Sequence, residues 1–321
     1  MSRIEKPLCI ACGAQGQTLY TDLPDSTFFT TGTWSLSRCP NPGCELVWLT
    51  PLPSDSEIIG FYQNYYTHSE TDPASAAALN LSAAHGRAGL KSGAKALLGR
   101  LSTNSYRFRS DLRYLQDRKP GRLLDVGCGN GAFLAQAAAR GWRVFGQEFD
   151  AKAASVAADL SGADVQVGSL MDIGFDADFF DAVTLSNVLE HLPNPIQVMR
   201  EIKRILRPGG LLVSISPNPK SYLHEKYGKY WRGLEVPRHL FLFPPNALRS
   251  TAEDIGFTAV SAFSSLGEFD FMEQASQAIQ SQHVSDASMP RATPRHRKLA
   301  LQAAAILGQD VGEWSVIVAE R

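Results

Sequence analysis

The stretch that most constrains the fold lies at residues 123–133 and reads LLDVGCGNGAF. An apolar run leads to an acidic residue, and glycines follow at positions 127, 129 and 131. Glycine lets the backbone turn with a positive φ and approach a ligand with no side chain in the way. The residues that follow are expected to form a helix whose first N–H groups point at that ligand. The stretch therefore predicts a strand, a ligand-binding turn and a helix.

Strand and helix patterns alternate from residue 104 to residue 263, as in chains that build a parallel sheet. The last strand is predicted in EWSVIVAE, residues 313–320. A helix is expected over residues 107–118, and the basic cluster RHRK at 295–298 is expected in a solvated loop. The pattern favours a doubly wound α/β fold.

The glycine loop is compatible with more than one ligand. Gly127, Gly129 and Ala132 satisfy the dinucleotide pattern G-x-G-x-x-[GA], and Glu148 ends the next strand, where an acid binds ribose hydroxyls. Asp125 favours a different ligand, because a carboxylate beside the loop repels a pyrophosphate and attracts an ammonium or sulfonium group. A nicotinamide-dependent oxidoreductase remains the alternative at this point.

Four of the five cysteines lie near the N-terminus, at positions 9, 12, 39 and 44. Two cysteine pairs separated by 26 residues suit a tetrahedral zinc site in a small ribbon, and reduced free thiols are the alternative. Residues 1–52 contain few Lys or Arg, which disfavours nucleic-acid binding by this segment. The predicted zinc ligands are Cys9, Cys12, Cys39 and Cys44.

Residues 120–263 resemble the class I S-adenosylmethionine-dependent methyltransferases. Four pieces carry the resemblance in the family's order: LLDVGCGNGAF, VFGQEFD, FFDAVTLSNVLEHLPNP and LRPGGLLVSISPN. The resemblance implies a seven-stranded, mostly parallel, Rossmann-like sheet that binds S-adenosyl-L-methionine. Relatives often carry an acid near the adenine, whereas this chain has Ser169 near that place and Asp172 three residues later. The implied cofactor-binding residues are Asp125, Gly127, Cys128, Gly129, Gly131, Glu148, Phe149, Ser169, Leu170 and Asn187, with Cys128 taken as a packing position.

The box SNVLEHL follows the predicted fourth strand, and ligands of parallel sheets lie beyond the carboxyl ends of strands. His191 is the candidate general base, and Glu190 bonds the cofactor or orients a neighbour. The alternative is that His191 packs as a hydrogen-bonded residue before the next helix. A base is needed only if the acceptor must lose a proton.

A long polar and aromatic segment, about residues 218–243, follows the fifth predicted strand. Aromatic side chains together with Arg suit a ring, a sugar or a phosphorylated carrier. The alternative is a packed lid in which Arg238 pairs with Glu235. The substrate-side candidates in this segment are Tyr230, Trp231, Arg238 and His239.

Three regions are predicted: a zinc-ribbon-like module (1–52), a helical connector (53–103) and the methyltransferase domain (104–321). In the connector, a helix is expected to begin near Ser54, and a basic amphipathic helix over 83–101 covers the core, links domains or lies on a membrane. A net charge of -1, no apolar run of spanning length and no signal peptide predict a cytoplasmic protein. No nucleic-acid partner and no stable membrane insertion are expected, and the oligomeric state is left open.

The sequence thus predicts a methyltransferase with a small-molecule acceptor, S-adenosyl-L-methionine as cofactor and structural Zn²⁺. Relatives with an N-terminal ribbon include enzymes that methylate nucleotide-linked sugars, so a sugar or polysaccharide precursor is the favoured acceptor. The LEHL box is also similar to that of quinone-type O-methyltransferases. The alternatives from other classes are an NAD-dependent oxidoreductase and a non-catalytic zinc-ribbon binding protein.

Overall fold

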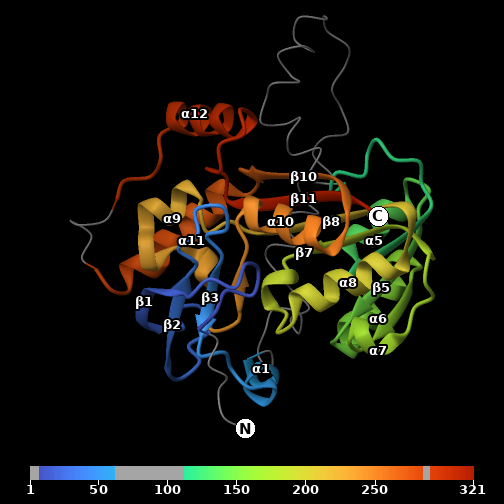
Figure 1. The fold of residues 1–321 in the computed structure, drawn as a ribbon, viewed down its shortest axis with the longest axis horizontal. Coiled ribbons are helices and arrows are strands. Elements are labelled where there is room, and N and C mark those ends of the chain that lie inside the picture. The colour runs from blue at the N-terminus through green and yellow to red at the C-terminus, as the bar shows by residue number, and fades with distance from the viewer. Residues whose placement is uncertain (1–6, 62–111, 285–289) are drawn as a thin grey trace, which may run out of the picture. The chain divides into compact units, whose positions relative to one another are not determined.

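The computed structural model describes residues 7–61, 112–284 and 290–321, which Figure 1 shows in colour. Contacts between residues divide the chain into two compact units, Met1–Gln63 with Asp176–Arg321 and Asn64–Phe175. Each unit is described by itself below. No helix within the described ranges is both long enough and apolar enough to span a membrane.

One sheet has seven strands in the order β10-β11-β8-β7-β4-β5-β6. Strand β4 pairs in parallel with β5, β5 with β6, and β7 with β8, whereas β11 is antiparallel to both β10 and β8. The strands are β4 (Arg122–Val126), β5 (Arg143–Glu148), β6 (Asp164–Val167), β7 (Phe180–Ser186), β8 (Leu206–Pro217), β10 (Thr258–Ser265) and β11 (Trp314–Glu320). This order confirms the predicted seven-stranded, mostly parallel Rossmann-like sheet.

In the unit that contains β4, β5 and β6, the apolar run before the glycines forms the centre of a strand. Leu123 and Leu124 have no exposed surface, because neighbouring strands and helices cover both faces of β4. Helices α5 (Ala132–Ala138) and α6 (Ala151–Ser161) contact β5, and α7 (Leu170–Ile173) is a single turn after β6.

The helix predicted over residues 107–118 is wrong in its described part. Residues 112–118 form successive turns, closed by hydrogen bonds from Leu115 N to Leu112 O (2.9 Å) and from Arg118 N to Leu115 O (3.0 Å). The reason is the backbone of Arg113 and Tyr114, whose φ values of 44° and 61° are incompatible with a right-handed helix.

In the other unit, α8 (Pro195–Ile205) contacts β8, and α10 (Pro245–Ile255) contacts β10 and β11. Helix α11 (Phe269–Ser281) contacts α9 (Tyr222–Tyr227) and the short helix η4 (Arg232–Leu234). The basic cluster at 295–298 opens α12 (Arg295–Ile306) and does not lie in the predicted loop. Pro294 precedes it with φ -68°, a value that is already suited to starting a helix.

A second sheet has four strands in the order β1-β2-β3-β9. Strands β1 (Gln17–Pro24), β2 (Thr33–Arg38) and β3 (Val47–Thr50) are drawn in blue in Figure 1 and form an antiparallel set. The fourth strand, β9 (Phe241–Leu242), comes from the end of the segment at 218–243 and pairs with β3. The small N-terminal sheet is therefore completed by residues that lie about 190 positions later in the chain.

Helix α1 (Asp55–Phe61) begins as predicted after Ser54. Ser54 N donates to Glu57 Oε2 (2.9 Å), and Glu57 N donates to Ser54 Oγ (3.4 Å), which is a capping box. The amphipathic helix predicted over 83–101 lies outside the described residues.

Candidate active site and metal centre

The loop after β4 adopts a left-handed backbone at each of its three glycines. The φ values are 64° at Gly127, 56° at Gly129 and 79° at Gly131. A Cβ at Gly131 would lie 2.6 Å from the Cα of Ala157, so helix α6 approaches the loop as closely as only glycine permits. A Cβ at Gly129 would meet nothing within 4 Å, so this side of the loop has room for a ligand.

The carboxylate of Glu148, at the end of β5, holds the glycine loop by a hydrogen bond. Its Oε2 accepts a hydrogen bond from Gly129 N (2.8 Å), and its Oε1 accepts from Phe149 N (2.8 Å) and Asp150 N (3.3 Å). The side chain is buried, with 8% of its surface exposed. The acid expected at the ribose thus also fixes the loop's backbone.

Asp125 is buried and forms an ion pair with Arg113. The guanidinium of Arg113 also lies over the ring of Phe133, 3.9 Å from its centroid. The carboxylate therefore has a cation beside it before any ligand arrives, which weakens the attraction to a sulfonium inferred from the sequence. Sequence reasoning missed Arg113, because it was assigned to a helix rather than to a turn.

Gln147 is a second residue that the sequence reasoning missed. Its Oε1 accepts from Gly127 N (3.2 Å), its Nε2 donates to Gly168 O (2.5 Å), and the side chain is 1% exposed. The only signal for it was its place one position before Glu148. Cys128 N donates to Gln147 O (3.0 Å), and burial raises the pKa of the Cys128 thiol to about 12, which leaves it protonated and poorly nucleophilic.

The remaining candidates for the cofactor have simple structural positions. Ser169 caps α7 by accepting from Met171 N (3.2 Å), and Leu170 is buried behind it. Phe149 exposes 62% of its surface directly after Glu148. Asn187, in the other unit, follows β7 with a left-handed φ of 55°, and its N–H donates to Ile215 O (2.9 Å).

The short helix η2 (Leu189–His191) carries the candidate acid and base. Glu190 has no exposed surface, and neither carboxylate oxygen has a hydrogen-bond partner among the described residues. Burial raises the pKa of Glu190 to about 8, because the charged form loses its hydration. A buried carboxyl without partners is costly and points to a role other than stability.

His239 lies beside this turn, so the structure brings together a predicted substrate-side residue and the predicted base. The rings of His191 and His239 are 4.7 Å apart between centroids. His191 Nδ1 is 3.1 Å from Arg238 O, and His239 Nδ1 is 2.8 Å from Gly233 O. A carbonyl only accepts, so each Nδ1 carries the proton and each Nε2 keeps its lone pair.

Ligand atoms of Glu190, His191 and His239 all lie within 4.8 Å of one another. Two imidazole nitrogens and a carboxylate are a donor set that transition metals accept, and the same groups can hold or move a proton. Burial lowers the pKa of His239 to about 3 and also lowers that of His191, so both rings are neutral near pH 7. Neutral imidazole is the form needed for either task.

Arg238 lies in a buried ion network. Its guanidinium bonds both oxygens of Asp25 (2.7 and 2.9 Å) and Glu235 Oε1 (3.2 Å), and none of its side chain is exposed. Glu235 also pairs with Arg232 and lies 3.6 Å from His239 Nε2. The pairing with Glu235 that the sequence allowed is present, and Asp25 is an additional partner that the sequence did not suggest.

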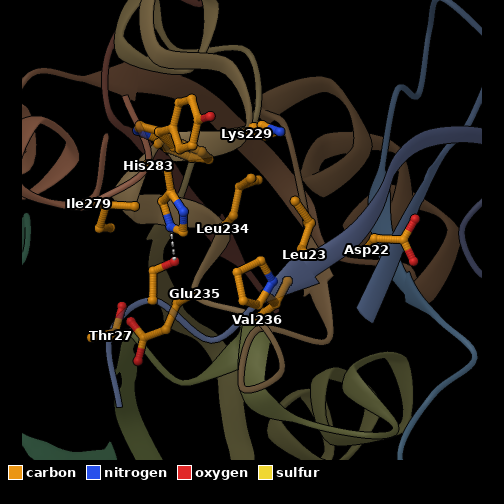
Figure 2. A pocket seen from close by; sticks show the side chains of 13 residues that line it. Asp22, Leu23, Thr27, Lys229, Leu234, Glu235, Val236, Ile279 and His283 are labelled. Carbon is orange, nitrogen blue, oxygen red and sulfur yellow. Dashed lines mark hydrogen bonds between the residues drawn. The ribbon is translucent and has the colours of Figure 1, made fainter. Parts of the chain in front are cut away.

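Trp231 and Tyr230 have different surroundings. Trp231 is 1% exposed, donates from Nε1 to Glu313 Oε2 (3.0 Å) and stacks on His224 with 4.8 Å between centroids. Tyr230 stacks on His283 (5.6 Å). Both border a cavity of about 310 Å³, which Figure 2 shows from close by, between the end of β1, the 229–236 segment and α11.

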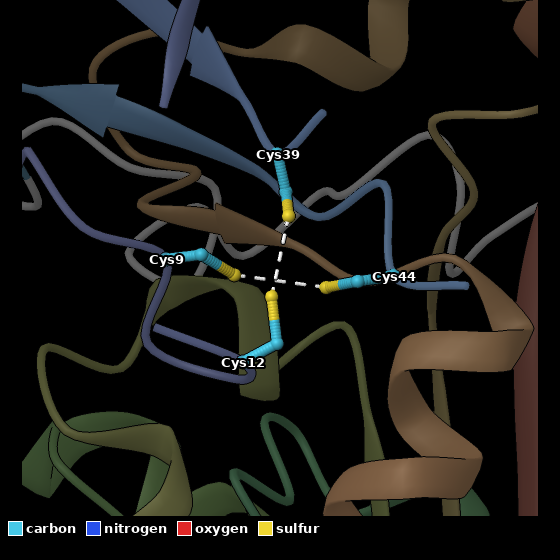
Figure 3. Close-up of side chains that lie close together, drawn as sticks. All are labelled: Cys9, Cys12, Cys39 and Cys44. Atoms are coloured by element: carbon cyan, nitrogen blue, oxygen red, sulfur yellow. Dashed lines mark hydrogen bonds between the residues drawn. The ribbon is translucent and has the colours of Figure 1, made fainter. Parts of the chain in front are cut away.

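The four N-terminal cysteines converge on one point, as Figure 3 shows. The Sγ atoms of Cys9 and Cys44 are 3.6 Å apart, and those of Cys12 and Cys39 are 3.4 Å apart. Thiolates about 2.3 Å from a tetrahedral zinc ion would be about 3.8 Å from each other, so the spacing fits the metal. Cys9, Cys39 and Cys44 are buried, and Cys12 is exposed.

The protonation of the cluster supports the same fit. The hydrogen bond from the thiol of Cys44 lowers the pKa of Cys9 to about 5, and the same bond raises the pKa of Cys44. Burial raises the pKa of Cys39 to about 11. Thiols this close cannot all ionise by themselves, whereas a divalent cation bound between them would favour four thiolates.

Comparisons with known proteins agree with this geometry. The profile of a family described as "Methyltransferase domain" matches residues 101–262, slightly more than half of the chain. A ubiquinone biosynthesis O-methyltransferase from Aeromonas salmonicida is 32% identical over 139 residues, covering 40% of this chain and 58% of that protein. One from Psychrobacter arcticus is 35% identical over 153 residues, covering 43% of this chain and 59% of that protein. The matched region thus spans little more than half of these relatives.

Among solved structures, a SAM-dependent methyltransferase from Archaeoglobus fulgidus is 18% identical, with a TM-score of 0.47 and coverage of 67% of this chain and 91% of that chain. The family profile, in contrast, covers strands β4 to β8, the glycine loop and the η2 turn. The chain belongs to the methyltransferase-domain family.

Proposed function

We propose that the protein is an S-adenosylmethionine-dependent methyltransferase with a small-molecule acceptor, working in the cytoplasm. The observation that carries the proposal is the glycine loop, open at Gly129 and fixed by Glu148, in a chain of the methyltransferase-domain family. The family match favours this function over a nicotinamide-dependent oxidoreductase and over a binding module without activity.

The residues present fit the cofactor. Glu148 has a buried carboxylate whose lone pairs suit ribose hydroxyls, and the exposed ring of Phe149 next to it offers an apolar face. The three glycines leave room for the methionine part, and Gln147 keeps the first of them in place. When bound, S-adenosylmethionine supplies an activated methyl group on a sulfonium.

The proposed acceptor is a ring hydroxyl of a catechol-type compound, as in the biosynthesis of quinones. The relatives named above are ubiquinone biosynthesis O-methyltransferases, which favours the quinone-type alternative, while the comparisons offer no support for a nucleotide-linked sugar. Such a hydroxyl must lose its proton as it attacks the methyl group in line. His191, neutral and with a lone pair on Nε2, is the proposed base. Glu190 lies beside it with a carboxyl that burial keeps mostly protonated near pH 7, and its proposed task is to orient a neighbouring group.

Binding and transfer are tested separately. Isothermal titration with S-adenosylhomocysteine and with NAD should give micromolar or tighter affinity for the first and none for the second. Labelled S-adenosylmethionine with catechol-type and nucleotide-sugar acceptors should then label the catechol only. Binding of NAD alone would refute the cofactor assignment, and labelling of the sugar alone would refute the acceptor class.

We further propose that Cys9, Cys12, Cys39 and Cys44 hold one structural zinc ion. Elemental analysis of the purified protein should give one zinc per chain, and Cys12→Ser should lower that content. Cys128→Ser is the matched control, because this buried thiol lies outside the cluster. The site would be disproved by protein that contains no zinc although its thiols were kept reduced during purification.

A further inference from the structure

We propose that the N-terminal four-stranded sheet is a positioning element for η2, through backbone bonds at Leu240 and an ion pair at Arg238. The sheet then serves the enzyme itself and is not a module for an external partner. The inference rests on the proposed function for its effect on turnover, but its structural part is independent of that function.

The first link is the backbone of Leu240, which lies between His239 and β9. Its N–H donates to Glu190 O (2.7 Å), and its C=O accepts from Leu49 N in β3 (3.0 Å). Leu49, Leu240 and Glu190 are all buried, at 0%, 1% and 0% exposure. Because the N–H and the C=O of Leu240 are both hydrogen-bonded, a shift of β3 moves the backbone of Glu190 with it.

The second link is the side chain of Arg238, whose backbone oxygen accepts from His191 Nδ1. Its guanidinium is held in the two-oxygen bond to Asp25 and lies over the ring of Phe28, 4.0 Å from the centroid. Two parallel N–H···O bonds fix orientation as well as distance. The residue that presents the carbonyl to His191 is therefore anchored in the loop between β1 and β2.

Asp25 is itself held rigidly. Its Oδ1 accepts from Thr27 N (3.1 Å) and Phe28 N (3.0 Å), and its Oδ2 accepts from Thr30 N (3.1 Å). The β1–β2 loop is folded around this carboxylate, so the anion is placed before Arg238 meets it. Replacing a buried ion pair by apolar side chains is often neutral for stability, so a role in fixing a unique geometry is the better account.

The cysteine cluster lies at the other ends of the same strands. Cys39 directly follows β2 and donates its N–H to Leu46 O (2.9 Å), and Cys44 comes three residues before β3. A metal at the cysteines would hold the β2–β3 hairpin, and β3 is the strand that bonds Leu240. The described part of the module, residues 7–52, contains Arg38 as its single Lys or Arg, so these residues offer no basic surface for nucleic acid.

The test compares Asp25→Asn with Asp270→Asn. Asp270, on α11, forms an exposed ion pair with Lys298, on α12, and serves as the matched control. With ¹⁵N-labelled histidine, wild-type His191 should show the neutral form with the proton on Nδ1. Asp25→Asn should change the His191 signals and lower kcat about 10-fold or more, while the Kd for S-adenosylhomocysteine stays within about 2-fold. Asp270→Asn should change none of these.

Asp25→Asn leaves Arg238 buried without its main counter-ion and can fail to fold, so a double variant is needed. Asp25→Asn with Arg238→Met removes both charges and should restore the thermal midpoint while the His191 signals stay altered. Wild-type His191 signals in either folded variant would overturn the proposal. Failure of wild-type protein to bind S-adenosylhomocysteine would instead overturn the proposed function, because the histidine spectra need neither cofactor nor acceptor.

Discussion

Glu148 and Glu190 are both buried glutamates at candidate ligand sites, but their hydrogen bonding is opposite. Glu148 accepts three backbone N–H groups, so its charge is used to shape a loop. Glu190 has two carboxylate oxygens with no partner among the described residues. We infer from this contrast two uses of one side chain: Glu148 shapes a site in advance, and Glu190 is retained at a cost to stability for the proposed chemistry.

The largest expected effect comes from removing the satisfied glutamate. Glu148→Ala should weaken binding of S-adenosylhomocysteine about 100-fold or more, equal to about 3 kcal/mol. The glycine loop loses its charge-assisted hydrogen bond at Gly129, and the turn after β5 loses those at Phe149 and Asp150. Titration calorimetry measures the loss. Asp164→Ala, an exposed acid at the start of β6, is the control and should bind normally. Unchanged affinity in Glu148→Ala would show that the carboxylate does not organise the cofactor site.

The unsatisfied glutamate should behave in the opposite way. Glu190→Leu should raise the free energy of unfolding by about 1–3 kcal/mol, because it removes a buried polar group without partners. Turnover should fall, and the affinity for S-adenosylhomocysteine should stay the same. Chemical denaturation and steady-state assays measure the two effects. A less stable variant would mean that Glu190 has favourable interactions in the fold, and the comparison with Glu148 would fail.

A third buried glutamate, Glu313, is intermediate in its hydrogen bonding, and its replacement should give the smallest effect. It accepts from Leu223 N (3.2 Å) and Trp231 Nε1 (3.0 Å), yet burial still raises its pKa to about 8. The folded state therefore holds an extra proton above the usual pKa of 4.5, so the free energy of unfolding falls as pH rises toward 8.

Glu313→Gln should remove about 1 kcal/mol per pH unit of that dependence between pH 6 and 7. Denaturant titrations of the variant and the wild type at several pH values measure it. Glu320→Gln, near the C-terminal end of β11, should keep the wild-type dependence. Identical pH profiles for Glu313→Gln and wild type would show that Glu313 is already ionised in the folded protein.

The sequence was sufficient for those parts of the molecule that local pattern determines. The alternation of strands with helices predicted the doubly wound α/β fold, the family resemblance implied its seven strands, and the spacing of the glycines predicted the turn after β4. The cysteine pairs predicted a cluster that the structure brings together. Each of these depends on residues close in sequence or on residue types with narrow chemistry.

The contacts between distant residues could not be read from the sequence. Asp25 and Arg238 are 213 positions apart, and nothing local marks either as the partner of the other. Arg113 was assigned to a helix because its neighbours have helical spacing, but the ion pair with Asp125 accompanies a left-handed backbone instead. Tertiary contacts override local propensity in both cases, and the buried partners of Arg238 support the positioning role proposed above.

The pairing of β3 with β9 also means that β3 must wait for its partner strand during synthesis. Strand β3 leaves the ribosome about 190 residues before its neighbour β9. At 5–20 residues per second, the wait is roughly 10–40 s. During that time the VWLT edge, with Trp48 and Leu49, is uncovered and open to wrong pairing or to a chaperone. The first 50 residues of the nascent protein therefore stay exposed to wrong pairing until β9 has been synthesised.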